Sequence, residues 1–198
     1  MNARATKTDL LGLEALSFER GGYFRREDAH TYGITDRLLS YHTKTGRFER
    51  VLPAVFRIAR APISQLDEFL LAWVWSRYRG AISHESALSL YGLSDLVPRR
   101  IQVTVPTDES RRSSRFSIYR SDLKEDEVTF YEGVQATTPA RSIADAAAAG
   151  SDPEQIQKAV REGIQRGLFV PEMLRKAVQR KSRNRTMSQR LLELALQE

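Results

Sequence analysis

The sequence contains no cysteine among its 198 residues and only three histidines. The absence of cysteine excludes disulfides, thiol catalysis and cysteine-ligated zinc or iron–sulfur sites. No stretch approaches the roughly 18 consecutive apolar residues of a membrane-spanning helix, and the first residues lack the apolar region of a signal peptide. We therefore expect neither export nor membrane insertion. A cytoplasmic location fits a chain without cysteine.

Charge is distributed unevenly along the chain. Residues 1–60 carry 11 basic and 7 acidic side chains, residues 61–171 carry 13 and 15, and residues 172–198 carry 7 and 3. The corresponding net charges are +4, −2 and +4. Hydrophobic residues make up 41% of the chain, which is enough for one core or two small ones. The basic N-terminal part favours a polyanionic partner.

A helix-turn-helix is predicted for residues 21–46. The first helix is expected to end at Gly33, because glycine tolerates the positive φ of a tight helix exit. Ile34 would fill the corner between the two helices. Thr35 is the expected N-cap of a second helix that runs to about Thr43.

The second helix combines an apolar stripe with a polar face. Ile34 and Leu38 are spaced for burial, together with either Tyr41 or His42. The polar side chains that remain available are Arg37, Ser40 and Lys44. Their chemistry is that of contacts to base edges and phosphates.

A β-hairpin is predicted next, with strands at residues 47–51 and 55–60 around a turn that contains Pro53. In a winged helix, the second helix enters the major groove and such a hairpin lies against the flanking backbone. Candidates for phosphate contacts are the hairpin arginines, Arg47, Arg50, Arg57 and Arg60. The imperfect apolar alternation does not tell which of them face outward. The alternative is a helical hairpin and β-ribbon used only for packing or dimerisation.

The chain divides where its composition changes, near Pro62. Before this point, a first helix over residues 10–18 has Thr8 or Asp9 as its cap. After it, an amphipathic helix with two tryptophans begins at Leu66. The expected domains are residues 1–62, a winged helix-turn-helix, and residues 63–198.

The second domain is expected to be mixed, so the predicted fold class is α+β. Period-2 patterns place its strands at residues 101–105, 116–120, 128–131 and 134–137. Caps, N1 prolines and closing glycines place its helices at residues 83–91, 140–149, 153–166 and from 171 onward. A last helix around residues 191–195 follows a basic patch at residues 180–185.

Two motifs of this domain suggest catalysis. Ser83, His84 and Glu85 are consecutive, but neighbours on a helix point about 100° apart, so we expect a capping serine beside a satisfied histidine. The acidic run at residues 125–127 could hold a divalent cation. Because it lacks the glycine-spaced loop of a calcium site, we expect a solvated turn there.

The order of these segments resembles the AbiEi antitoxin family of abortive-infection, type IV toxin–antitoxin systems. The segments that carry the resemblance are the winged helix preceded by residues 22–24, then residues 83–88, 101–106 and 137–145. They cover most of the chain. The resemblance implies an N-terminal domain that binds inverted repeats in its own promoter and represses transcription. It also implies a C-terminal domain that opposes a nucleotidyltransferase-like toxin.

The resemblance also implies residue roles. The DNA readers would be Thr35, Arg37, Ser40 and Lys44, with the hairpin residues Arg47 and Arg50 beside them. The candidate DNA-binding set also includes Arg25, Arg26, Tyr41 and Arg57. For antitoxin function the matching motif contains Arg141 and Asp145, whose i, i+4 spacing also allows a purely structural pairing at the helix start. If exposed, that pair would contribute only a few tenths of a kcal/mol.

We therefore expect a non-enzymatic repressor and antitoxin that needs no cofactor or metal. Its partners would be double-stranded promoter DNA, bound cooperatively by monomers or by a dimer, and a toxin that the family opposes without a stable complex. One alternative is a metal-dependent nuclease that uses Glu125, Asp126 or Glu132. Another is an interaction module whose basic N-terminus binds an acidic protein.

Overall fold

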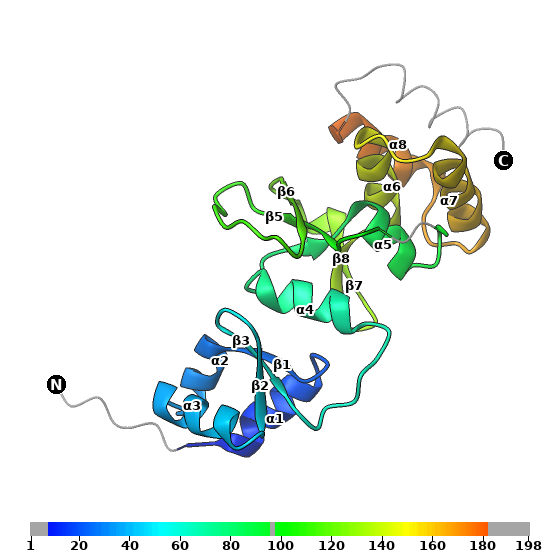
Figure 1. Cartoon of the computed structure of the whole chain (residues 1–198). Helices are drawn as coiled ribbons and strands as arrows, with labels where there is room; N and C mark the ends of the chain where they lie inside the picture. Colours follow the sequence, from blue (N-terminus) through cyan, green and yellow to red (C-terminus); the bar gives the residue numbers. More distant parts are fainter. Residues whose placement is uncertain (1–7, 96–97, 182–198) are drawn as a thin grey trace. The chain divides into compact units, whose positions relative to one another are not determined.

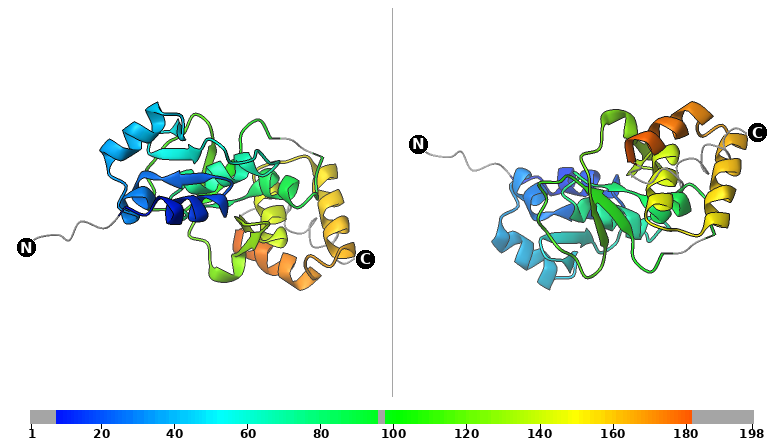
Figure 2. Two further views of the ribbon diagram at one scale, coloured as in Figure 1. Left: turned by 90° about the horizontal axis from the view of Figure 1, so that it is seen from below. Right: turned by 90° about the horizontal axis from the view of Figure 1, so that it is seen from above.

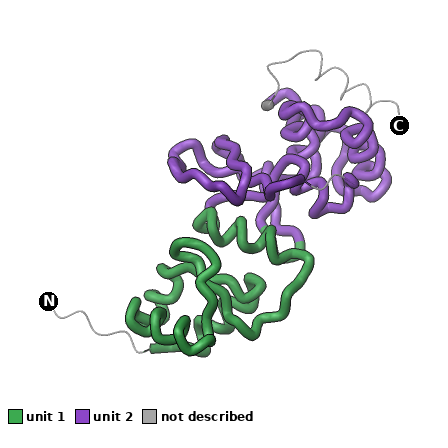
Figure 3. The backbone as a smooth tube through the Cα atoms, viewed as in Figure 1, with its two compact units in different colours: residues 1–78, 132–134 green, residues 79–131, 135–198 purple. Residues whose placement is uncertain are grey.

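The structure, a computed structural model, describes residues 8–95 and 98–181 (Figure 1). It divides into two compact units, shown in different colours in Figure 3. The first unit extends to Tyr78 and also includes Glu132–Val134, while the second comprises Arg79–Tyr131 and the chain from Gln135. The described residues contain helices and two small sheets, so the predicted α+β class is confirmed.

The first unit is a winged helix, as predicted. Its elements are α1 (Leu10–Phe18), β1 (Tyr23–Arg25), α2 (Arg26–Thr31), α3 (Asp36–Lys44), β2 (Phe48–Leu52), β3 (Val55–Ile58) and α4 (Asp67–Trp75). The strands form an antiparallel sheet in the order β1-β3-β2, with α1 to α3 drawn in blue beside it in Figures 1 and 2. The short strand β1, ahead of the helix-turn-helix, was not predicted.

The turn between α2 and α3 has the predicted construction. Gly33 has a φ of +71°, Ile34 is fully buried, and the Thr35 hydroxyl accepts a hydrogen bond from the Leu38 amide at 3.4 Å. At the other end of the unit, Asp9 rather than Thr8 caps α1. These local signals therefore set the helix boundaries.

An aromatic core fixes the hairpin to the helices. The Phe24 ring lies edge-on to Phe48, with ring centroids 5.0 Å apart, and stacks on Phe56 at 5.7 Å. The remaining members of this buried cluster are Leu13, Ala29, Ile34, Leu39, Ile58 and Ala61. Because one core joins the helices and all three strands, the hairpin has a defined position beside α3.

The first unit extends beyond the predicted boundary at Pro62. Helix α4 lies against β1, where the Tyr23 hydroxyl donates to Asp67 Oδ2 at 3.2 Å. Just after the helix, the Tyr78 hydroxyl donates to the Asp28 carboxylate. Helix α4, predicted to begin the second domain, thus belongs to the first unit, and the division by contacts lies after Tyr78.

The second unit contains a five-stranded sheet and a helical C-terminal part. Its elements are β4 (Ala81–Ile82), α5 (His84–Leu90), β5 (Gln102–Val105), β6 (Ser117–Arg120), the 3₁₀ turn η1 (Glu125–Glu127), β7 (Val128–Tyr131), β8 (Val134–Thr137), α6 (Pro139–Ala148), α7 (Pro153–Gln165) and α8 (Pro171–Lys181). The strand order is β6-β5-β4-β8-β7. Helix α6 contacts α5, α7 and α8.

Most elements of this unit match the predicted segments, but the central strand β4 does not. Its two residues are too few for a period-2 pattern to be recognised. Most of the predicted basic patch at residues 180–185, and the predicted last helix, lie outside the described residues. None of the helices in the described ranges combines the length and apolar character needed to cross a membrane.

Candidate nucleic-acid interface

Helix α3 has one buried and one exposed side. Leu39 is 3% exposed, whereas the Tyr41 side of the helix is open, with Tyr41 itself 59% exposed. His42 is half-buried, and its ring centroid lies 5.1 Å from that of Phe48. Of the two candidates for the apolar stripe, His42 is therefore the one that packs inward.

The exposed side of α3 contains the predicted DNA readers. At about 100° per residue, the arc opposite the core comprises Arg37, Ser40, Tyr41 and Lys44, all exposed. Arg37 and Lys44 form no hydrogen bond or ion pair with another described residue. Thr35 is exposed at the start of this arc, although its hydroxyl is engaged in capping.

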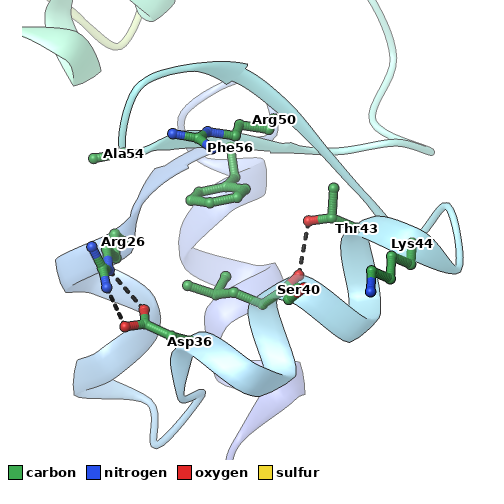
Figure 4. A pocket seen from close by; sticks show the side chains of 9 residues that line it. Arg26, Asp36, Ser40, Thr43, Lys44, Arg50, Ala54 and Phe56 are labelled. Carbon is green, nitrogen blue, oxygen red and sulfur yellow. Dashed lines mark hydrogen bonds and ion pairs between the residues drawn. The ribbon is translucent and has the colours of Figure 1, made fainter.

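A groove of about 440 Å³ lies between α3 and the β2–β3 hairpin (Figure 4). Its lining residues are Arg26, Asp36, Leu39, Ser40, Thr43, Lys44, Arg50, Ala54 and Phe56. Three of these residues are basic and one is acidic. Arg50 is exposed and has no partner among the described residues, so it and Lys44 give the groove an uncompensated positive charge.

Asp36 joins the starts of α2 and α3. Arg26 Nε donates to Asp36 Oδ1 at 2.7 Å, Arg26 Nη2 donates to Oδ2, and His30 Nε2 lies 2.9 Å from Oδ1. Hydrogen bonds from Arg26 and His30 lower the pKa of the Asp36 carboxyl to about 2. Asp36 is therefore ionised at neutral pH. Arg26, a predicted DNA contact, already shares its charge with this carboxylate.

The base of the hairpin is held by Glu14 of α1. Arg47 Nη2 donates to Glu14 Oε1 at 2.9 Å, and Arg60 Nη2 donates to Oε2 at 2.5 Å. Burial by itself would raise the pKa of the Glu14 carboxyl, but the hydrogen bonds and charges of Arg47 and Arg60 outweigh it and leave the pKa below its ordinary value. The Glu14 carboxylate thus partly compensates the positive charges of both arginines.

Arg25 and Arg57 do not belong to the exposed set, so their prediction as DNA contacts is wrong. Each is only 6% exposed. Arg57 Nη2 donates to the carbonyls of Ala61 and Pro62 at 2.8 and 3.0 Å, and Arg25 Nη2 lies 2.8 Å from the Glu27 carboxylate. All four residues of β3 are buried, which is why the apolar alternation could not tell inward from outward arginines.

Sequence reasoning did not identify Glu14 or Asp36 as residues of this interface. The signal for Glu14 was available, since it is the one charged residue inside the otherwise apolar segment of residues 10–18. Asp36 stands at the first position of α3, where an acidic residue is ordinarily explained by the helix dipole alone. Its pairing with α2 depends on the angle between the two helices, which the sequence does not specify.

In the second unit, Arg141 and Asp145 are buried instead of exposed. Arg141 Nε lies 3.0 Å from both carboxylate oxygens of Asp145, and Arg141 Nη1 donates to Glu127 Oε1 at 2.5 Å. The relative exposures are 4% for Arg141, 0% for Asp145 and 5% for Glu127. These side chains connect α6 to η1 in the interior and present no surface to a partner.

The acidic run is a solvated turn only in part, because Glu125 and Asp126 are exposed whereas Glu127 is buried. Glu127 is buried against Arg141, and Asp126 accepts a hydrogen bond from Arg180 Nη1 at 3.0 Å. Only Glu125 of this run lacks an arginine partner among the described residues. Of the three carboxylates named for the nuclease alternative, Asp126 is engaged in an ion pair with Arg180, whereas Glu125 and Glu132 are exposed and have no ion-pair partner among the described residues.

His84 is hydrogen-bonded, as expected, but its partner is the Ser83 hydroxyl, which was expected to cap α5. Ser83 is extended and His84 has a φ of +55°, so the two are not successive residues of a regular helix. The Ser83 hydroxyl lies 2.9 Å from His84 Nδ1 and accepts a hydrogen bond from Thr104 Oγ1 at 2.8 Å instead of capping α5. Glu85 accepts from Ser151 at 2.6 Å. Both Ser83 and His84 are buried, so the pair is closed to solvent.

Comparison with models of known protein families gives no match, and comparison with curated proteins gives none either. Among solved structures, the crystal structure of the RV2827C protein from Mycobacterium tuberculosis is similar, with a TM-score of 0.64 and 15% sequence identity. The match covers 93% of this chain and 75% of that chain. The likeness is one of fold.

Proposed function

We propose that this protein is a sequence-specific DNA-binding transcriptional autorepressor. The observation that carries the proposal is the set of exposed cations without partners among the described residues, Arg37 and Lys44 on α3 and Arg50 on β2. They lie on the helix and hairpin that contact DNA in winged-helix proteins. What favours a polyanionic partner is that these three cations lie together on the helix and hairpin of one winged helix.

In the proposed complex, α3 enters the major groove. Arg37 and Ser40, near its N-terminus, reach base edges, because the first turns of a recognition helix lie deepest in the groove. Lys44 and Arg50 flank the groove of Figure 4 and contact phosphates of the backbone beside it. Tyr41 adds an exposed phenol that can donate to a phosphate.

The resemblance to AbiEi antitoxins extends the proposal to a cytoplasmic antitoxin that opposes a nucleotidyltransferase-like toxin, with no catalytic activity of its own. Within it, we assign Arg141 and Asp145 to the interior of the second unit and not to a contact surface, because both are buried. The toxin-opposing activity would then depend on exposed residues of that unit.

A pair of substitutions tests the roles of Arg37 and Arg50. Arg37→Ala is expected to reduce the preference for promoter DNA over a scrambled duplex by about 1 to 3 kcal/mol, because a base-edge contact is lost. Arg50→Ala is expected to weaken binding to both duplexes alike, because phosphates carry no sequence information. Fluorescence anisotropy with both duplexes measures the two affinities.

Arg47→Ala provides the matched control for Arg50→Ala, because both residues belong to the hairpin but Arg47 is already paired with Glu14. We expect Arg47→Ala to reduce DNA affinity less than Arg50→Ala does. If the Arg37 and Arg50 variants lost the preference for promoter DNA over scrambled DNA to the same extent, the assignment of Arg37 to base contacts and of Arg50 to phosphate contacts would be refuted.

A further inference from the structure

One acidic side chain lies among the cations of the groove between α3 and the hairpin. Of the described residues that line this groove, Arg26, Lys44 and Arg50 are basic, and Asp36 alone is acidic. Its position at the start of α3 suits the helix dipole. A carboxylate nevertheless repels phosphates, so a contact to the DNA backbone does not account for it. Its surroundings point to a different partner.

The carboxylate of Asp36 is held in one orientation. Arg26 donates to it through Nε and Nη2 together, which is the paired geometry that fixes a carboxylate in the plane of the guanidinium. His30 Nε2 lies 2.9 Å from Oδ1 on the same carboxylate. The hydrogen bonds from Arg26 and His30 lower the pKa of the Asp36 carboxyl to about 2, so at neutral pH it accepts hydrogen bonds and donates none.

One oxygen of this carboxylate can accept a further hydrogen bond. Each oxygen of an ionised carboxylate accepts about two. Oδ1 accepts from Arg26 Nε and lies within hydrogen-bond distance of His30 Nε2, so both of its positions are occupied. Oδ2 accepts from Arg26 Nη2 and from no other described residue. Because the Asp36 side chain is 53% exposed, a donor from another molecule has access to it.

Asp36 lies beside the residues proposed to contact bases. It immediately precedes Arg37 and is four residues before Ser40, which places it about 40° around the helix from Ser40. Asp36 and Ser40 both line the groove (Figure 4). In helix-turn-helix proteins the N-terminal residues of the recognition helix contact base edges. Asp36 is the first residue of α3 and therefore belongs to this region.

We propose that Asp36 determines sequence specificity by accepting a hydrogen bond from the N4 amino group of a cytosine in the operator. The inference rests on the proposed function, which places α3 in the major groove. There, cytosine presents an amino donor, whereas guanine and thymine present acceptors that a carboxylate repels. Adenine presents its amino group beside the N7 acceptor, which also faces the carboxylate unfavourably. Asp36 thus selects cytosine over the other three bases.

The test is a binding selection in which the full chain is mixed with duplexes of its own promoter, randomised across the bound segment, and the retained duplexes are sequenced. Asp36→Asn is the informative variant, because an asparagine amide accepts from adenine N6 and donates to adenine N7. Asp36→Ala removes the acceptor and supplies no other. The matched control is Glu49→Gln, which removes the same charge from an exposed residue of β2 that has no partner among the described residues. Circular dichroism melting confirms that each protein is folded.

Wild type is expected to prefer cytosine about fivefold or more over the other bases at one base pair of each bound site. Asp36→Asn should change that preference to adenine, and Asp36→Ala should abolish it, while the preferences at the other base pairs are kept. Glu49→Gln should strengthen binding to all duplexes, because a charge that repels phosphates is lost, and should leave every base preference unchanged.

The gain of adenine decides between base contact and a purely structural role, because the release of Arg26 would by itself only weaken a preference. A folded Asp36→Asn protein that gains no preference for adenine would overturn the inference, and so would an unchanged cytosine preference in Asp36→Ala. The same change of preference in Glu49→Gln would overturn it too, since the effect would then follow from charge alone. The proposed function fails differently: the wild type itself would then enrich no sequence.

Discussion

Replacing Arg141 by methionine is expected to destabilise the second unit by about 3 to 5 kcal/mol, because the change leaves buried carboxylates without their cation. Glu127 and Asp145 are 5% and 0% exposed, and both accept hydrogen bonds from Arg141. Urea unfolding followed by circular dichroism measures the loss, and hydrogen exchange in α6 assigns it to this unit. A loss below about 1 kcal/mol would contradict the account of the buried network.

The pH dependence of stability gives this prediction a second readout. Burial would raise the pKa of the Glu127 carboxyl, but the Lys124 amide and the charges of Arg141 and Arg180 leave it below its ordinary value of 4.5. A carboxyl with a lowered folded-state pKa stabilises above about pH 4.5, and that contribution disappears as the pH falls through the folded pKa. Without Arg141, burial dominates, so acidification toward pH 4.5 should stabilise the variant relative to neutral pH.

A fragment of residues 1–78 is expected to fold and bind operator DNA, whereas a fragment of residues 1–62 should bind at least about tenfold more weakly. The shorter fragment lacks α4, which covers β1 and supplies Asp67 to the buried Arg57, 3.7 Å away, and to Tyr23. A Cβ on Gly21 would lie 2.8 Å from Leu70 Cδ1, so the chain before β1 also packs closely on this helix. Anisotropy with the operator duplex compares the two fragments.

Asp67→Ala in the full chain provides the control that leaves the chain intact. It should lower the unfolding midpoint of the first unit, because Arg57 is buried and loses its carboxylate partner. Equal binding by the two fragments, together with an unchanged midpoint for Asp67→Ala, would place the boundary back at Pro62.

The sequence predicted the winged helix because its signals are local. Gly33 ends α2 and Thr35 caps α3, and each acts through contacts within a few residues of the chain. The apolar stripe of α3 was predictable for the same reason, except for the choice between Tyr41 and His42. That choice depended on Phe48, which packs against His42 from the hairpin.

The features that the sequence did not predict depend on contacts between residues far apart in the chain. The spacing of Arg141 and Asp145 predicts a pair, but only the fold brings Glu127 to it and makes it interior. The stripe of α4 predicts that one face is buried, not which sheet buries it. The apolar pattern of β3 was ambiguous because the strand is covered on both faces, and this ambiguity hid the burial of Arg57.

The central claim is that α3 and the β2–β3 hairpin bind specific DNA through uncompensated cations. Anisotropy of the full chain with duplex DNA from its own promoter, at increasing salt and with scrambled competitor, tests it most directly. If about five to eight phosphates are neutralised, log affinity should fall with log salt at about −0.9 per contact, and scrambled DNA should compete at least about 10³-fold less well. A slope near zero, or equal competition by scrambled DNA, would contradict the account.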